Sequence, residues 1–435
     1  MNLDIFLYEM KHFVRDKAKL FSYIFFMSIC ILSLYNGIQI AEKQVKTILE
    51  IEEKKELDIN KMQDWFKQGI KGPEGRSWVN IEDPYWAIRY TPTYIYKNPS
   101  PLLPLGIGQS QQFGFYKKIN RWSSTYDTDV VEEISNYERL INGNIDFSFL
   151  IIYLLPILFI ILTYNINGLE KDLRFDKLIS IQNKKTKIWI FKRWLFYFLM
   201  MIFSVNILIL FFSLITSFIS DYQSIIKIIL ISNLYILFFC FIFYILNIYG
   251  KSSSAIAFKM ISVWLAFCVI IPGSIHQYIA YKYPVNYMTD FLDVNRKETY
   301  DVFKFENDDL LKMLIEVHPE IKEDKNIDDL NLESQKIRRS ISSIVNQMNI
   351  NAALEIDKQN ENKNRLIALC YFINPVSYIQ NLWNSYTSTD YDSYKEFRSE
   401  MQNSINARNR LMVLEMWNKN TVDMEKYQEY LKVLE

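Results

Sequence analysis

Five long apolar segments alternate with strongly polar segments along this chain of 435 residues. The apolar segments cover residues 20–41, 147–169, 194–220, 228–250 and 260–281, and none contains Asp, Glu, Lys or Arg. A helix needs roughly 20 apolar residues to cross the hydrocarbon core of a bilayer. The pattern therefore predicts an all-α polytopic membrane protein with five transmembrane helices.

Two long polar segments lie outside these spans, at residues 42–146 and 282–435. Residues 42–68 have helical periodicity and are expected to continue the first span, until Gly72-Pro73-Glu74-Gly75 breaks the helix. The proline-rich stretch that follows indicates extended and looped backbone. Residues 308–366 are rich in helix formers, so the second segment is predicted to be helical. We expect two extracytoplasmic, mainly helical domains.

Residues 366–383 form a further apolar stretch that is interrupted by polar residues. It contains Asn374, Pro375, Ser377, Gln380 and Asn381, which are costly in lipid. Two interpretations stay open: an atypical sixth span, or a segment in the core of the second domain or against the membrane.

The first 19 residues are amphipathic. One face carries apolar residues and the other charged ones: Leu3, Ile5, Phe6, Met10, Phe13 and Val14 against Asp4, Lys11, Arg15 and Lys19. Such a segment can lie in the plane of the membrane interface. The alternative is a simple basic flank of the first span.

The location of charge is more informative than its sum, because Lys+Arg and Asp+Glu are equal at 49 each. This balance gives no indication of nucleic-acid binding. Basic residues gather before the first span and between residues 170 and 193, whereas the turn between the third and fourth spans has few. The positive-inside rule then predicts a multi-pass protein of the cell membrane with a cytoplasmic N-terminus.

Motifs for chemistry are missing from the sequence. Three of the four cysteines lie inside predicted spans, and the three histidines, His12, His276 and His318, are scattered. Neither set has the spacing of a disulfide framework or a metal site. We expect no catalytic, cofactor or metal site in this chain, and any energy source would belong to a partner.

Several short motifs occur in an order that resembles one family. They are FLYE at residues 6–9 with Arg15-Asp16, PLLPLG at 101–106, NGNIDFSF at 142–149, YLLP at 153–156, GLEK at 168–171, YPV at 283–285, HPE at 318–320 and NPV at 374–376. Together they resemble ABC-2-type transporter permeases of the subgroup with two large extracytoplasmic insertions.

The resemblance implies a permease subunit that binds a separate cytoplasmic ATPase, which holds ATP-Mg, and that pairs with a second permease copy or a homologous permease. In that family the segment after the second span is a coupling helix, which here corresponds to residues 170–193. The matching residues are Gly168, Glu170, Lys171, Arg174 and Lys177, and those of the N-terminal interfacial segment are Glu9, Arg15 and Asp16. Arg174 and Phe175 stand where Gly-Thr is common.

The family normally has a final span after the second insertion, and none is evident here. The chain is either shortened, or residues 366–383 take that role, or another subunit supplies the helix. An alternative function is a non-transporting membrane receptor or immunity protein that binds a peptide or envelope component through its outer domains. An adjacent ATPase reading frame would favour the permease.

Overall fold

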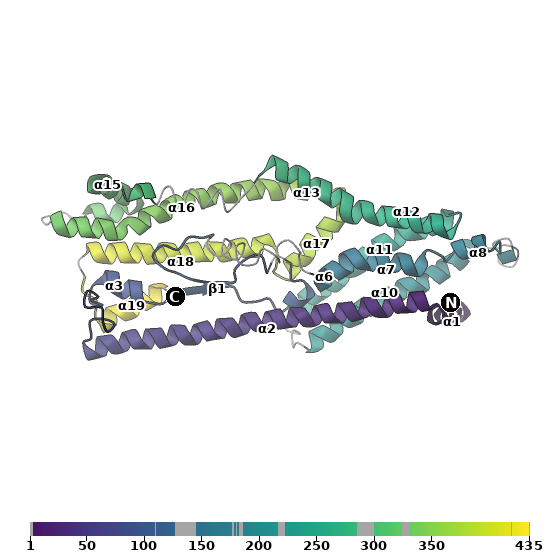
Figure 1. Cartoon of the computed structure of the whole chain (residues 1–435), viewed down its shortest axis with the longest axis horizontal. Helices are drawn as coiled ribbons and strands as arrows, with labels where there is room; N and C mark the ends of the chain where they lie inside the picture. Colours follow the sequence, from purple (N-terminus) through teal and green to yellow (C-terminus); the bar gives the residue numbers. More distant parts are fainter. Residues whose placement is uncertain are drawn as a thin grey trace.

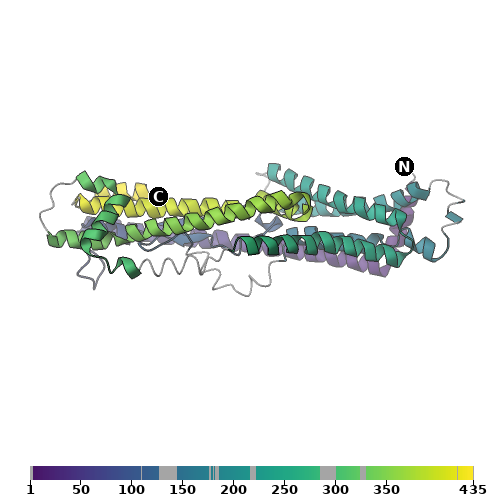
Figure 2. The same cartoon turned by 90° about the horizontal axis from the view of Figure 1, so that it is seen from above.

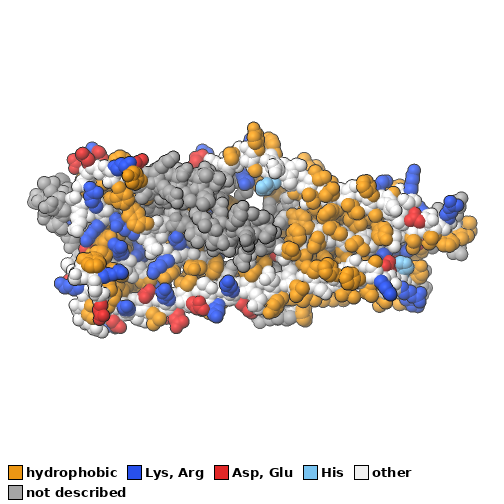
Figure 3. Space-filling model, viewed as in Figure 1, with side chains coloured by type: hydrophobic (Ala, Val, Ile, Leu, Met, Phe, Trp, Pro, Cys, Tyr) orange, Lys and Arg blue, Asp and Glu red, His pale blue; other side chains and the backbone are white. Residues whose placement is uncertain are grey.

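The computed structural model of the chain is an elongated, almost entirely helical molecule (Figures 1 and 2). It describes residues 3–108, 110–126, 145–175, 178–179, 181, 186–215, 222–284, 300–323, 330–418 and 420–434. A bundle of apolar helices forms the half that contains the N-terminus, and a helical lobe rich in charged residues forms the other (Figures 1 and 3). We call these halves the bundle and the polar lobe.

Within the described residues, five helical segments are long and apolar enough to cross a membrane, as predicted. The first is α2 (Lys17–Gln68). The second span combines α6 (Phe147–Phe149), η2 (Leu150–Leu154), α7 (Leu155–Thr163) and α8 (Gly168–Asp172). The third span is α10 (Thr186–Ile215) and the fourth is α11 (Tyr222–Tyr249). The fifth span combines α12 (Ser253–Leu265), η4 (Ala266–Ile270) and α13 (Ile271–Lys282). The sequence placed the start of the third span at residue 194 and of the fifth at 260. Both helices begin a turn or more earlier, in their polar flanks.

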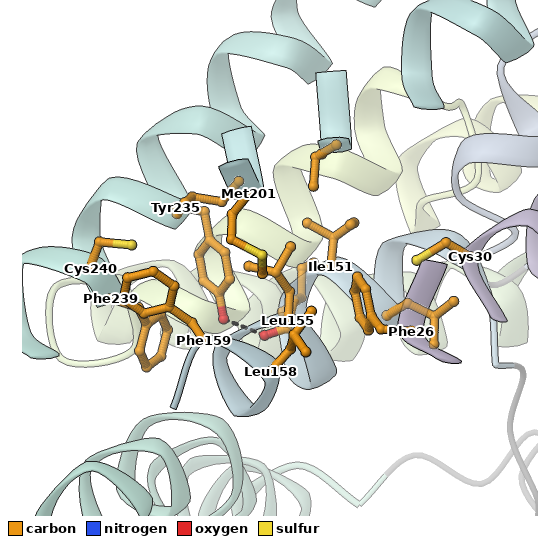
Figure 4. Close-up of a cluster of buried hydrophobic side chains, with 14 of the residues drawn as sticks. Phe26, Cys30, Ile151, Leu155, Leu158, Phe159, Met201, Tyr235, Phe239 and Cys240 are labelled. Atoms are coloured by element: carbon orange, nitrogen blue, oxygen red, sulfur yellow. Dashed lines mark hydrogen bonds between the residues drawn. The ribbon is translucent and has the colours of Figure 1, made fainter. Parts of the chain in front are cut away.

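The second span is the centre of the bundle. Its apolar window is 67% buried, against 17% for the fifth span. Helix α7 contacts α2, α10, α11 and α12. Figure 4 shows this buried cluster. Leu155 and Phe159 of α7 lie near Phe26 of α2, Met201 of α10 and Tyr235 of α11.

Both interrupted spans contain a π-helical turn next to a proline. In the second span, Pro156 has no N–H to donate to the carbonyl of Ile152. The Tyr235 hydroxyl of α11 donates to that carbonyl instead, and the indole N–H of Trp264 donates to the carbonyl of Tyr153 at 2.9 Å. Neighbouring helices thus satisfy backbone groups that the irregular turn leaves free.

The polar lobe is built from both polar segments. Its helices are the C-terminal half of α2, α3 (Pro84–Tyr90), α15 (Asn307–Val317), η5 (Pro319–Glu323), α16 (Leu330–Leu369), α18 (Tyr391–Trp417) and α19 (Met424–Leu434). It also contains a two-stranded antiparallel sheet of β1 (Tyr94–Tyr96) and β2 (Tyr116–Lys118), in which Ile95 pairs with Lys117. The predicted continuation of the first span to residue 68 is confirmed, and Gly69 ends it with φ 68°.

The two polar segments share hydrophobic cores, although the sequence treated them as separate domains. Ile81, Tyr85 and Ile88 of the first pack with Met412 and Tyr427 of the second in one buried cluster. Each segment alone leaves an apolar face uncovered, so the lobe forms only when the two meet.

The stretch at residues 366–383 is not a span in the structure. It divides into the end of α16, η6 (Cys370–Phe372) and the first part of α17 (Pro375–Tyr386), because Asn374 caps a new helix that starts at Pro375. Val376 and Trp383 of α17 are buried among the bundle side chains. The stretch therefore packs against the helices of the bundle, an arrangement that the sequence analysis did not predict.

A junction joins bundle and lobe at the PLLPLG motif. The turn η1 (Leu103–Leu105) lies against α2, where a Cβ added to Gly37 would lie 2.6 Å from Cα of Pro104. The Trp383 indole N–H donates to the carbonyl of Leu105 at 2.9 Å. This motif therefore fixes α2 and α17 to each other.

The surface of the bundle is mostly apolar, as Figure 3 shows, with charged side chains at its far end and over the lobe. Large side chains stay exposed on several spans, including Phe21, Leu32, Phe203, Leu214, Phe241 and Phe258. A band of this kind is stable in contact with lipid rather than water. The chain is a membrane-spanning protein.

Candidate functional site

The candidate site lies at the end of the bundle where the N-terminus and α8 come together (Figure 1). Helix α1 (Leu3–Arg15) ends where Asp16 caps α2, its carboxylate accepting the backbone N–H groups of Ala18 and Lys19 at 3.2 and 3.3 Å. The chain turns there, and Arg15 is exposed at the turn. Asp16 thus sets the corner between α1 and the first span.

The amphipathic character of α1 is visible in its contacts. Phe13 is buried against Tyr23 and Tyr197, while Leu7 and Val14 stay half exposed. Part of the apolar face is therefore used inside the molecule, and the remainder is open to its surroundings.

Arg193 forms a buried ion-pair network with two carboxylates. It pairs with Glu9 of α1 and with Glu170 of α8, and it also donates to the carbonyl of Ile166 at 2.8 Å. Arg193 is 3% exposed and Glu9 is fully buried. A guanidinium has enough donors to serve several acceptors at once, which allows one side chain to join three segments.

Lys19 is a second buried cation beside this network. Its ammonium donates to the carbonyl of Leu162 and to Oδ1 of Asn165, both at 2.7 Å, and lies 5.0 Å from the centre of the Tyr197 ring. Asn165 thus forms a hydrogen bond between two helices. The first and second spans are thereby joined at the same level as Arg193.

Helix α8 is seated on the turn between α11 and α12. The ammonium of Lys171 donates to the carbonyl of Gly250 at 2.5 Å, and the Asp172 carboxylate accepts the N–H of Ser253 at 3.2 Å. A Cβ on Gly168 would lie 2.5 Å from Cα of Ser253. Only glycine permits this approach, which explains the residue at that position.

The end of α8 exposes a short apolar and basic knob. Arg174 has φ 60°, and the N–H of Phe175 bonds to the carbonyl of Glu170 at 2.8 Å while that of Arg174 bonds to Lys171 at 3.1 Å. This pair of bonds is a Schellman motif, whose left-handed position favours glycine. Leu173, Arg174 and Phe175, which we call the α8 knob, all face outward.

The structure brings four of the eight predicted site residues together. Glu9, Gly168, Glu170 and Lys171 take part in one connected set of contacts, whereas Arg15 and Arg174 are exposed. Lys177 lies outside the described residues. Because these contacts join α8 to α1, α10 and the α11–α12 turn, we expect a movement of α8 to displace those segments as well.

Two central residues of the network were not recognised as such in the sequence. Arg193 was expected only as a basic flank of a span and Lys19 only on the charged face of the N-terminal segment, but both are buried and have polar partners. Each stands directly before an apolar run, and Glu170 follows another in the same way. Opposite charges at the same end of several predicted spans could have suggested that Arg193 pairs with Glu170.

Comparison with protein-family models, with curated proteins and with solved structures finds no match to this chain.

Proposed function

We propose that this chain is the permease subunit of an ABC-type exporter, which works with a separate cytoplasmic ATPase that binds ATP-Mg and with a second permease copy or a homologous permease. The N-terminus and α8 then lie in the cytoplasm, and the polar lobe lies outside the cell. The resemblance in the ordered motifs supports this proposal, as does the distribution of basic residues.

The observation that carries the proposal is the seating of α8. Glu170 and Lys171 turn inward, to Arg193 and to the carbonyl of Gly250, so they position the helix. The exposed side chains of the α8 knob are free to contact a partner. Leu173 is 55% exposed and Phe175 is 52% exposed. Exposed apolar side chains on a helix that is held in place by buried contacts are suited to a subunit that receives force from an ATPase.

Substitutions on the α8 knob test this function. The full chain carrying an affinity tag is purified from its native membranes in mild detergent, and proteins that copurify are identified by mass spectrometry and by ATPase activity. The double variant Leu173→Asp with Phe175→Asp should reduce the yield of the nucleotide-binding subunit roughly tenfold, because desolvated apolar contacts carry most of the energy of an interface.

A matched control carries the same change on exposed apolar residues of the polar lobe, Tyr300→Asp with Leu354→Asp. Its ATPase yield should equal that of the unmodified chain. Full recovery of the ATPase with the knob variant would refute the docking role of α8. If no nucleotide-binding protein copurifies with the unmodified chain, the exporter function itself is refuted and the receptor function is favoured.

A further inference from the structure

Three arginines surround one tyrosine at the end of the polar lobe farthest from the N-terminus, where α3 and the start of α16 lie (Figure 1). The tyrosine is Tyr85 of α3, which is buried. The guanidinium carbons of Arg339, Arg121 and Arg89 lie 4.5, 5.5 and 5.8 Å from the centre of its ring. The three come from α16, from the segment after β2 and from α3. We call these four residues the arginine cluster.

The positive charges of the arginine cluster outnumber its carboxylates. Among the described residues, one carboxylate pairs with any of the three arginines, that of Asp83, and its partner is Arg339 at 2.7 Å. Arg89 and Arg121 each donate to the Tyr85 hydroxyl at 2.9 Å, so the two donor nitrogens are at most twice that distance, 5.8 Å, apart. Burial lowers the pKa of Arg121, and the charges of Arg89 and Arg339 lower it further. Two guanidinium charges thus lie close together without a described counter-charge.

Aromatic rings hold both guanidiniums in place. Arg89 lies 5.1 Å from the centre of the Trp86 ring, and Arg121 lies 4.8 Å from that of Trp122. Arg121 also donates to two successive carbonyls of α16 at 3.0 and 2.9 Å. Cation–π contacts and hydrogen bonds would be lost if either side chain moved away from the other. The two like charges are therefore fixed beside each other before any ligand arrives.

The described contacts give these two arginines different roles. Arg121 joins the segment after β2 to α3 and α16. The hydrogen bond of Arg89 stays within α3, where it reaches Tyr85 one turn earlier, and Arg89 is exposed. Trp122 beside Arg121 is 45% exposed. The cluster is therefore open to solvent, and a ligand of opposite charge would be stabilised there.

We propose that the arginine cluster binds the phosphate group of a water-soluble phosphate monoester. Such a group carries nearly two negative charges at neutral pH, since its second pKa is about 6. This charge matches the two guanidiniums that lack a counter-charge, Arg89 and Arg121. Oxygens of one phosphate accept hydrogen bonds from two guanidiniums at once, whereas a carboxylate carries a single charge. The inference does not depend on the exporter function.

The position of the cluster favours a soluble ligand over a lipid headgroup. Tyr90 of α3 packs on Trp65 of α2, with the ring centres 6.5 Å apart. Trp65 lies 24 residues beyond residue 41, where the apolar part of α2 ends. At 1.5 Å per residue, this separation is about 36 Å along the helix. Headgroups of the surrounding membrane are therefore out of reach of the cluster.

Isothermal titration calorimetry on the full chain in phosphatidylcholine nanodiscs tests the proposal, at constant ionic strength and with heats from empty nanodiscs subtracted. The probe is phenyl phosphate, and benzoate is the comparison with the same ring and one charge. Phenyl phosphate should bind saturably and at least roughly tenfold more tightly than benzoate, because only a dianion compensates both guanidiniums. Equal affinities, or no saturable heat from phenyl phosphate, would overturn the proposal.

A second set of nanodiscs distinguishes a soluble ester from a lipid headgroup. These nanodiscs contain phosphatidic acid, whose headgroup is itself a phosphate monoester. The affinity for phenyl phosphate should be the same as in phosphatidylcholine at equal ionic strength, because the headgroups do not reach the cluster. A lower affinity in these nanodiscs would show that headgroups compete for the site and would overturn the soluble source.

Two variants with the same change of net charge assign the binding to this cluster. Arg89→Gln removes one of the two uncompensated charges, and Arg365→Gln removes an exposed charge elsewhere on the lobe. Arg365 lies 26 residues beyond Arg339 on α16, which is about 39 Å along the helix. Arg89→Gln should weaken phenyl phosphate binding roughly tenfold, and Arg365→Gln should leave it unchanged. Equal affinities of the two variants would overturn the site.

Thermal unfolding followed by circular dichroism separates a ligand role of Arg89 from a role in folding. Phenyl phosphate should raise the unfolding temperature of the unmodified chain, because it binds the folded state, and this rise should be reduced in Arg89→Gln. Without ligand, Arg89→Gln should unfold at the same temperature as the unmodified chain or higher, since it removes a like-charge contact and keeps an amide donor. A lower temperature would show that the fold needs this charge and would overturn the proposal.

Discussion

Two buried arginines show how the same side chain serves different surroundings. In the bundle, Arg193 meets two carboxylates, Glu9 and Glu170. In the polar lobe, Arg408 has carbonyl and hydroxyl acceptors instead, among them Thr91 at 3.2 Å and Thr93 at 2.7 Å. Burial lowers the pKa of Arg408 to about 10, because acceptors without full charge compensate only part of the lost hydration. Both arginines join segments that are far apart in the sequence.

The network around Arg193 leads to a stability prediction. Arg193→Met should destabilise the detergent-purified protein by about 3–5 kcal/mol, because it leaves Glu9 and Glu170 buried without a counter-charge. The triple variant with Glu9→Leu and Glu170→Leu should recover most of that loss, since it removes the stranded charges as well. Thermal unfolding followed by circular dichroism measures both effects. A triple variant no more stable than Arg193→Met would mean that packing, rather than charge, dominates at this position.

At the scale of elements, glycines and prolines decide where helices approach one another and where they break. Gly37 lets η1 lie directly on α2, and Gly168 lets α8 lie on the start of α12. Pro156 and Pro272 follow the π-helical turns of the second and fifth spans. These contacts depend on small or irregular positions, which the average hydropathy of a span does not reveal.

Two helical glycines make a matched pair for testing the junction. Gly37→Ala should destabilise the protein by about 1–3 kcal/mol, because the new methyl group meets the backbone of Pro104. Gly273→Ala has open space within 4 Å and should instead stabilise α13 by up to about 1 kcal/mol through helix propensity. Thermal unfolding of the two variants under identical conditions compares them. The same shift from both would show that α2 and η1 are not in close contact.

At the scale of the whole molecule, α2 connects the two halves. Its 52 residues correspond to a length of about 78 Å at 1.5 Å per residue, enough to cross a bilayer and continue along the lobe. Helix α17 makes the second connection, and η1 fixes it to α2. A movement of the bundle would therefore be transmitted to the polar lobe through α2 and α17, which are fixed to each other by η1.

The proposed orientation can be tested by labelling in intact cells. In a Cys370→Ser background, whose other cysteines are buried, single cysteines at the exposed positions Asn60, Arg338 and Leu178 are treated with a thiol reagent that cannot cross the membrane. Positions 60 and 338 should react and position 178 should react only after the cells are opened, because the basic flanks direct α8 inward. The reverse pattern would invert the topology and exclude an α8 contact with a cytoplasmic ATPase.

The sequence by itself determined the class of this protein, the five spans and the extension of the first helix to Gln68. Those properties follow from local composition and periodicity, since a long and continuously apolar helix is stable in lipid whatever its neighbours are. Its motifs also singled out Glu9, Gly168 and Glu170 as candidate site residues, but did not indicate what these residues contact.

Only the tertiary structure decided which polar groups are paired. Arg193 and Glu9 are 184 residues apart, and Arg408 and the carbonyl of Ile88 are 320 apart. The placement of residues 366–383 and the shared core of the lobe also depend on such distant contacts. A buried charge is stable only beside its partner, and that partner is chosen by the packing of the helices, which no local pattern encodes.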